Sequence, residues 1–284
     1  MGLECLRAVT ELLQRVRSAH PTAGLYEAAD LQWWWRVPRS TDALEQLIWF
    51  DHEGRPASAA VATAWNDRVA VDPIVLPGSP PDWVVHVVER GLAHAEACGI
   101  RDIGLEVGRD DEVLRGALER HGFAIEADGV VEAWLTTVDR PAISRLHADY
   151  ALSTRVVTSH DPHHMISEAR NHPDPEPRLR QTSLYRPDLD LVVHDRDGNV
   201  AAYGLFWYDP VTDTGLVEPM RTEDAHRRRG LARHVLTTGI DLLARAGARR
   251  VKICFEPDNP AARDLYLGVG FVPHRQTDLY ARHR

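Results

Sequence analysis

The sequence predicts an α/β protein made of two tandem domains, each a central mixed β-sheet flanked by helices. Two observations predict this fold. Residues 215–255 read as strand, loop, helix and strand, because two short apolar strands flank a segment whose apolar residues recur every three or four positions. Residues 83–123 repeat the later part of this pattern: an ungapped shift of 148 residues places Gly99 on Gly247 and Phe123 on Phe271. Under this shift the glycine that caps the helix, the alternation of the following strand and the final Gly-Phe of the first copy all fall on their counterparts in the second copy. This agreement indicates an internal duplication.

The first half opens with an amphipathic helix to about residue 19, and a second helix is expected at residues 27–36. Its three consecutive tryptophans, Trp33 to Trp35, cannot all face one side of a helix. We expect them to pack between elements, with the wall of a ligand groove or domain interface as the alternative. Strands are expected at residues 47–50, 59–65 and 130–138.

The domain boundary is expected where Asp139-Arg140-Pro141 ends the last strand of the first half. This divides the chain into a first domain at residues 1–140, a linker at 141–149 and a second domain at 150–284. The second domain is expected to hold a strand at 152–157, a short helix at 162–170, a stiff loop at 172–177, and a hairpin of strands 190–194 and 199–208.

A basic loop meets the start of the helix at residue 231. Arg227, Arg228 and Arg229 are followed by Gly230, and the first N–H groups of a helix lack partners inside it. Since the helix dipole is positive at this end, the loop is a candidate cradle for a pyrophosphate, and Gly230 lets phosphates approach the backbone closely. The alternative is a surface helix with solvated arginines.

The spacing Arg227-Arg228-Arg229-Gly230-Leu231-Ala232 resembles the Q/R-x-x-G-x-G/A signature of the GNAT N-acetyltransferases. A second stretch resembles that family's later signature, N-x-x-A-x-x-L-Y-x-x-x-G-F, and runs from Asn259 through Ala262, Leu265 and Tyr266 to Gly270-Phe271. The two signatures occur in the right order. The resemblance covers roughly residues 150–284.

The resemblance implies acetyl transfer from acetyl-coenzyme A, the expected cofactor, directly to an amine. The residues that we expect to bind this cofactor lie in and beside the two signatures: Met220, Thr222, Arg227, Arg228, Arg229, Gly230, Leu231, Ala232, Asn259 and Ala262. Glu218 is the expected base, directly or through water, and Tyr266 the expected acid for the departing thiolate. Pro219 removes a ladder hydrogen bond, so a bulge that separates the strands is expected there.

The first copy is expected to have lost this chemistry. Its corresponding loop is Pro77-Gly78-Ser79-Pro80-Pro81, and proline removes N–H donors. The same shift places Asp82 opposite Gly230, which sets a negative charge where pyrophosphate would lie. We therefore expect no acetyl-coenzyme A in the first domain, and we interpret the acidic run Asp110-Asp111-Glu112 as a helix N-terminus.

Charge divides unevenly along the chain. Residues 1–140 hold 23 acidic and 13 basic residues, a net charge of −10, and residues 141–284 hold 19 and 20, a net charge of +1. An acidic first half attracts cations, so we expect the acceptor to be the primary amine of a cationic small molecule, such as an aminoglycoside-like antibiotic or a polyamine. Antibiotic resistance is then the expected role. The alternatives are a mycothiol-synthase-like enzyme with a cysteinyl pseudodisaccharide acceptor, and a non-catalytic sensor of acetyl-coenzyme A.

Other partners and metals are not expected. The chain has no long apolar run and no signal peptide, so a soluble cytoplasmic protein without membrane or nucleic-acid partners is expected, either a monomer with pseudo-dimeric tandem domains or a homodimer. Its three cysteines are widely spaced. His160, His163 and His164 match no defined metal-site spacing, and no metal is expected.

Overall fold

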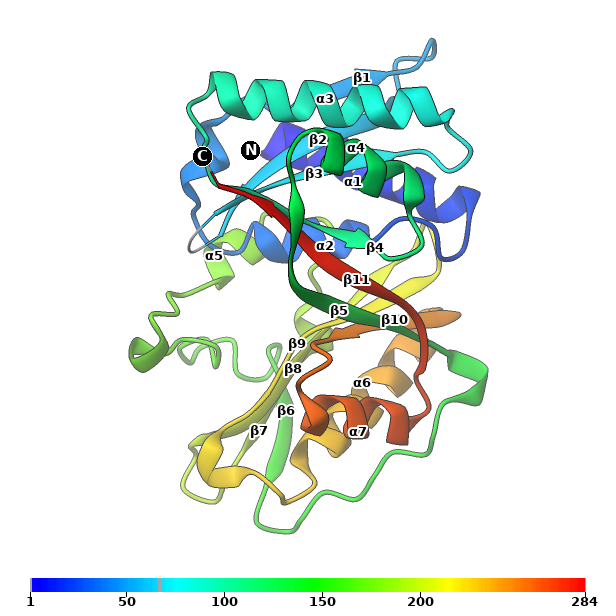
Figure 1. Ribbon diagram of the computed structural model, residues 1–284. Coiled ribbons are helices and arrows are strands. Elements are labelled where there is room, and N and C mark those ends of the chain that lie inside the picture. The colour runs from blue at the N-terminus through cyan, green and yellow to red at the C-terminus, as the bar shows by residue number, and fades with distance from the viewer. Residues whose placement is uncertain (1, 66–67, 284) are drawn as a thin grey trace. The chain divides into compact units, whose positions relative to one another are not determined.

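The fold was analysed in a computed structural model that describes residues 2–65 and 68–283. It is a mixed α/β structure, as predicted, and its contacts divide the chain into two compact units (Figure 1). Unit 1 comprises residues 1–31, 38–131 and 275–284, and unit 2 comprises residues 32–37 and 132–274. No helix in the described ranges is long and apolar enough to cross a membrane.

Unit 1 contains a sheet in the order β1-β2-β3-β4-β11-β5. Its strands are β1 (Leu47–Phe50), β2 (Pro56–Ala64), β3 (Val69–Val75), β4 (Ile103–Gly108), most of β11 (Val272–Arg282) and the first part of β5 (Ala124–Thr136). Its helices are α1 (Leu3–Ala19), the start of α2 (Ala28–Trp34), α3 (Pro81–Ala97) and α4 (Glu112–Arg120). The core of this unit joins apolar residues of α3, α4, β3 and β4 with Tyr280 of β11.

Unit 2 contains the end of β5 and the order β5-β10-β9-β8-β7-β6. The strands are β6 (Ala151–Thr154), β7 (Asp190–His194), β8 (Val200–Asp209), β9 (Thr214–Thr222) and β10 (Arg250–Phe255). The helices are α5 (Glu176–Leu179), α6 (Leu231–Ala246) and α7 (Pro260–Val269). Gly239 of α6 lies against the ring of Phe206 so closely that an added Cβ would come within 2.1 Å of it.

The two units are not consecutive halves of the chain, because the division falls inside β5 and β11. Residues 277–282 of the last strand pair antiparallel with β4 of unit 1. Conversely, Glu132 of β5 lies in unit 2, where its carboxylate is 3.2 Å from Nζ of Lys252, the only lysine in the sequence. Both side chains are buried, and a buried charge needs such a partner. Each unit therefore contains a strand segment from the opposite half of the sequence.

The internal repeat is confirmed at the level of elements. Shifting α3, β4 and α4 by 148 residues places them on α6, β10 and α7 to within two residues at each end. In each unit the strand before the long helix pairs in parallel with the strand after it.

One predicted element is wrong. Residues 162–170 form a loop with a short 3-10 turn (Glu168–Arg170), and not the expected helix. The backbone N–H of Met165 donates to the ring of His163 at 3.2 Å, a local bond that competes with a helical ladder. Helix α5 instead begins inside the loop expected at residues 172–177.

Candidate functional site

Strands β9 and β10 of unit 2 separate at the level of Glu218. Their parallel ladder, in the described structure, consists of the three pairs that join residues 214–216 to residues 250–252. On the other side of β9, Val217 pairs with Phe206 and Met220 with Gly204, so Glu218 and Pro219 face the single residue between them. This is the bulge that was predicted from Pro219. The bulge lies just beyond the point where the ladder between β9 and β10 ends, so the sheet of unit 2 is open between these two strands.

Glu218 lies at this opening. Its backbone carbonyl accepts a hydrogen bond of 2.8 Å from the indole of Trp207, whose side chain is fully buried. The Glu218 side chain is half-buried, and the peptide bond to Pro219 is cis. The backbone at Glu218 is thus fixed by the core, while its carboxylate side chain remains partly accessible, as a base that receives a proton from a bound amine must be.

The loop between β9 and α6 has the shape of an anion cradle. Arg228 and Gly230 both adopt left-handed conformations, with φ values of 64° and 77°, and Gly230 directly precedes the first residue of α6. Nothing lies within 4 Å of a Cβ built at Gly230, so the backbone there is open. The first turn of α6 contains no acidic residue. A phosphate at this position meets unpaired N–H groups and the positive end of the helix dipole.

The expected cofactor residues in this region divide into two kinds. Arg227, Arg228 and Arg229 are exposed, and Arg227 is held by Asp224 at 2.8 Å. In contrast, the Leu231 side chain is buried in the core, so only its backbone can face a ligand. Ala232 is half-buried in the first turn of the helix, as are Met220 and Thr222 on β9.

Thr222 carries a notable hydroxyl. Its Oγ1 is buried and has no hydrogen-bond partner among the described residues, although it lies at the end of β9 directly before the loop. Buried hydroxyls are normally hydrogen-bonded, so this atom indicates a missing partner. Together with the open backbone at Gly230, this hydroxyl fits a ligand that brings hydrogen-bonding oxygens, as a phosphate group does.

The second signature supplies Tyr266 and a helix cap. Tyr266 is buried beside Phe255 and Phe271, and burial, together with the nearby Cys254, raises the pKa of its hydroxyl to about 12. It therefore keeps its proton at neutral pH, as an acid must. The Asn259 side chain caps α7 by accepting from the N–H of Ala262 at 3.1 Å. This pair of expected cofactor residues thus holds the start of the helix that positions Tyr266.

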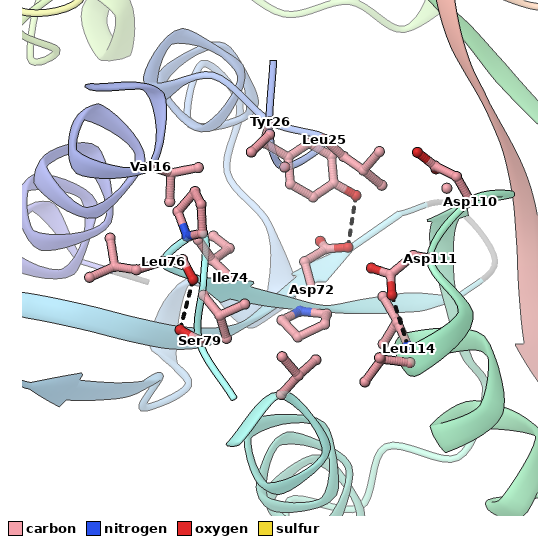
Figure 2. A pocket seen from close by; sticks show the side chains of 18 of the residues that line it. Val16, Leu25, Tyr26, Asp72, Ile74, Leu76, Ser79, Asp110, Asp111 and Leu114 are labelled. Atoms are coloured by element: carbon pink, nitrogen blue, oxygen red, sulfur yellow. Dashed lines mark hydrogen bonds between the residues drawn. The ribbon is translucent and has the colours of Figure 1, made fainter. Parts of the chain in front are cut away.

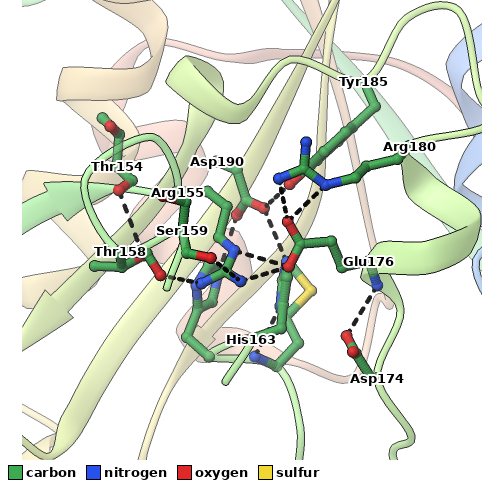
Figure 3. A network of polar contacts seen from close by, with 12 residues as sticks. Thr154, Arg155, Thr158, Ser159, His163, Asp174, Glu176, Arg180, Tyr185 and Asp190 are labelled. Atoms are coloured by element: carbon green, nitrogen blue, oxygen red, sulfur yellow. Dashed lines mark hydrogen bonds and ion pairs between the residues drawn. The ribbon is translucent and has the colours of Figure 1, made fainter. Parts of the chain in front are cut away.

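A long segment after β6 is held in place by Arg155 (Figure 3). This buried guanidinium donates to the backbone carbonyls of Thr158 and Asp161 and forms an ion pair with Glu176, which also binds Arg180 at 2.6 Å. Burial alone would raise the pKa of Glu176, but its hydrogen bonds with the two arginines hold the pKa below its usual range. The segment is thereby ordered without regular secondary structure over most of its length.

Arg170 joins this segment to the end of β9. Its guanidinium forms a two-pronged pair with Glu223 at 3.0 and 3.1 Å, and Arg221 also binds that carboxylate at 3.1 Å. Since Glu223 immediately follows Thr222, the segment is connected to the start of the cofactor loop. The segment after β6 therefore reaches this loop of unit 2 through Arg170.

The tryptophans of the first half pack in unit 2, which sequence reasoning did not foresee. Trp35 donates its indole N–H to Gln181 at 3.0 Å, and the guanidinium of Arg178 lies 4.1 Å from the centre of its ring. The side-chain oxygen of Gln32 accepts a hydrogen bond of 2.8 Å from the backbone N–H of Leu184. All three tryptophans are buried, which confirms the interpretation that they pack between elements.

A buried histidine cluster was also missed. His163 Nε2 lies 3.1 Å and His164 Nε2 lies 3.0 Å from the carboxylate of Asp190, which also accepts from Tyr185 at 2.8 Å. Burial would raise the pKa of Asp190, but the histidines lower it well below its usual range. The three ligand atoms lie within 4.8 Å of one another, close enough for one metal ion. The expectation that no metal binds stays a prediction. His160 is not a member of this cluster, and Asp190 gave no signal by spacing.

Comparison with known proteins defines the class. Residues 158–271 match the model of the Acetyltransferase (GNAT) family. The matched region contains β7 to α7, the bulge at Glu218 and the cradle before α6. This region of the chain is therefore similar to the GNAT acetyltransferases.

Two relatives extend the likeness beyond this domain. The mycothiol acetyltransferase of Beutenbergia cavernae is 28% identical over 245 residues, which cover 81% of this chain and 73% of the relative. That of Clavibacter michiganensis is 25% identical over 290 residues, which cover 94% and 88%.

Solved structures agree on the fold. A tandem GNAT protein from the clavulanic acid biosynthesis pathway matches with a TM-score of 0.69 at 14% identity, covering 99% of this chain and 95% of that one. A GCN5-related N-acetyltransferase from Sphaerobacter thermophilus matches with a TM-score of 0.64 at 17% identity, covering 99% and 93%. The predicted tandem arrangement is thus confirmed as a fold.

Proposed function

We propose that the chain is an acetyl-coenzyme A-dependent N-acetyltransferase whose acceptor is the cysteinyl amine of a mycothiol precursor, a cysteinyl pseudodisaccharide. The acetyl transfer is carried by one observation, the bulge at Glu218 on the strand that leads into the open cradle of α6. The acceptor is supported by the relatives named mycothiol acetyltransferase, one of which matches over 94% of this chain.

The roles of the residues follow from their surroundings. Acetyl-coenzyme A supplies an activated acyl group. The backbone of residues 228–232 and the exposed arginines would hold its phosphate end, and Thr222 would offer a further hydroxyl contact. The backbone N–H of Met220 is positioned on the bulged strand, where it polarises a carbonyl.

Proton transfer is assigned to Glu218 and Tyr266. A protonated amine has no lone pair, so Glu218 first removes one proton, directly or through one water. The free amine then forms the new carbon–nitrogen bond and loses a second proton to water. The carbon–sulfur bond breaks, and the Tyr266 hydroxyl donates a proton to the departing sulfur. The raised pKa of Tyr266 keeps that proton on the oxygen until a thiolate is present.

A competition among acceptors tests the proposal. The purified full-length chain is incubated with acetyl-coenzyme A and, in turn, the cysteinyl pseudodisaccharide, spermidine and an aminoglycoside. Acetylated product is measured by mass spectrometry, because the first acceptor carries a thiol that interferes with thiol assays. We expect kcat/KM for the pseudodisaccharide to exceed that for the others by at least ~100-fold, about 2.7 kcal/mol of transition-state binding.

The acidic first half favours the competing acceptor class, since its net charge of −10 attracts polycations. A preference for spermidine or the aminoglycoside would assign the enzyme to that class. Binding of acetyl-coenzyme A without acetylation of any acceptor would instead favour a sensor and would contradict the proposed activity.

A further inference from the structure

Unit 1 contains a cavity of about 480 Å³ where β3 and β4 separate (Figure 2). In the described structure the parallel ladder between these strands consists of two pairs, Val69 with Ile103 and Ala70 with Gly104. The cavity begins beyond the second pair and is lined by residues 72–75 of β3, by Glu106 and Gly108 of β4 and by the start of α4. It occupies the place in unit 1 that the acyl-transfer site occupies in unit 2.

The strand registers align one cavity residue with the expected base. Ile103 and Val251 are equivalent under the 148-residue repeat, and their ladder partners are Val69 and Gly215. Counting three residues onward from each partner places Asp72-Pro73 on Glu218-Pro219. The first copy has therefore kept a carboxylate, followed by a proline, at the position that meets the amine in the second copy.

Asp72 is buried, with 2% of its surface exposed, and it lines the cavity. Its Oδ1 accepts a hydrogen bond of 2.9 Å from the Tyr26 hydroxyl, and its Oδ2 has no hydrogen-bond partner among the described residues. Figure 2 shows Asp72 and Tyr26 meeting inside the cavity. Burial, and then the charge of Glu106, raise the pKa of Asp72 to about 7, although the bond from Tyr26 lowers it in part. An unpaired buried carboxylate oxygen favours a cationic donor.

The charged residues that line the cavity favour a positively charged ligand. Glu106, Asp110, Asp111 and Glu112 all line the cavity. Among the described lining residues the only arginine is Arg275, which lies 3.2 Å from Asp110. At the other end, Pro80 and Pro81 begin α3. They remove N–H donors that a phosphate requires. Much of the remaining wall is aliphatic, including Leu13, Val16 and Ile74.

We propose that this cavity binds a small organic ammonium ion, a protonated primary amine on an apolar body, with its charged group against Asp72. The Tyr26 hydroxyl holds one carboxylate oxygen, and the ammonium donates to the other. The aliphatic wall packs against the alkyl portion. The proposal is independent of the acceptor that unit 2 acetylates, because no residue of the cradle at α6 takes part.

Calorimetry on the full-length chain at pH 8 tests the proposal with n-hexylammonium as the probe and 1-heptanol as its neutral counterpart. We expect hexylammonium to bind more tightly than heptanol and Asp72→Asn to weaken hexylammonium binding by ~10- to 100-fold, because a charged hydrogen bond is lost. The matched variant Glu218→Gln, at the equivalent strand position of unit 2, should retain this binding, as should Asp102→Asn, an exposed carboxylate of unit 1 outside the cavity.

The unmodified protein supplies a second measurement that does not depend on a variant folding. Affinity for hexylammonium should rise with pH between 6 and 8, since Asp72 must lose its proton to attract a cation. The groups that face it are Tyr26, Glu106, Asp110, Asp111, Glu112 and Arg275, and none of the described lining residues is a histidine. Equal binding of heptanol, unchanged affinity in Asp72→Asn, or a flat pH profile would each overturn the proposal, as would a second acetyl-coenzyme A site in unit 1.

Discussion

Glu218 and Asp72 show how surroundings decide the use of one strand position. Both precede a proline at equivalent places in their units. Glu218 lies at a bulge and is half-buried, whereas the strand that carries Asp72 pairs regularly with β2 and buries the side chain. An accessible carboxylate suits repeated proton transfer, and a buried carboxylate with one free oxygen suits binding.

Replacing Glu218 with Gln should lower kcat by ~10- to 1000-fold with little change in the Kd for acetyl-coenzyme A. The amide cannot accept the amine proton, but its shape is nearly unchanged. Steady-state kinetics and calorimetry measure the two quantities separately. Wild-type turnover in this variant would remove Glu218 from the chemistry and leave positioning as the source of catalysis.

The Tyr266→Phe variant should also lose turnover, by a similar factor, while keeping its fold, because the phenyl ring retains the packing against Phe255 and Phe271. The raised pKa of Tyr266 means that the wild-type hydroxyl stays protonated up to about pH 12, so it should produce no decline in kcat between pH 7 and 10. A decline in that range that disappears in Tyr266→Phe would contradict the raised pKa, whereas wild-type turnover in Tyr266→Phe would contradict the role as acid.

Gly230→Asp should abolish binding of acetyl-coenzyme A. The new side chain places bulk and negative charge over the first N–H groups of α6, where the phosphates are expected. Gly78→Asp is the matched control: Gly78 has a φ of 83° and equally open space in the corresponding loop of unit 1. Calorimetry should detect one site per chain in the wild type and the control, and none in Gly230→Asp. Equal affinity in all three proteins would exclude the cradle.

Helix α6 packs closely on β8 because Gly239 has no side chain. Because an added Cβ at Gly239 would lie 2.1 Å from the Phe206 ring, Gly239→Ala should reduce the free energy of unfolding by ~1–3 kcal/mol. Gly116→Ala in α4 should instead stabilise by ~0.5–1 kcal/mol, because its nearest neighbour is 3.6 Å away at the end of a flexible arginine. Urea denaturation followed by circular dichroism measures both, and a stable Gly239→Ala would refute this packing.

Sequence predicted the elements whose signals are local. The cradle, the bulge at Pro219 and the hairpin of β7 and β8 all depend on residues close together in the chain. Features formed by distant residues were missed, such as Trp35 on Gln181 and the histidines on Asp190. The equivalence of Asp72 and Glu218 was also missed, because it needs a gap of two residues that an ungapped comparison excludes.

The whole molecule should resist division at residue 146. A fragment of residues 146–284 lacks Glu132 and residues 133–136 of β5, so Lys252 would lose its buried partner, at ~3–5 kcal/mol. It also lacks residues 32–37, which cover the segment near Gln181. We expect this fragment to show no cooperative thermal transition and little acetylation. A fragment of residues 124–284, which includes β5, should recover part of the thermal transition. Full activity of the 146–284 fragment would contradict this expectation and show that unit 1 is dispensable.

The pairing of β11 with β4 has a consequence for folding during synthesis. A ribosome makes residues 275–282 after the strands of the second unit, yet they complete the sheet of the first unit, so unit 1 cannot finish folding before unit 2 has been synthesised. Residues 132–136 are made much earlier, but they can take their place in the sheet of unit 2 only after β10 has been made. Deletion of either copy would remove a strand from the survivor. The first copy is therefore needed for the fold of the second, even though Pro77–Pro81 stand where the second copy has its basic loop.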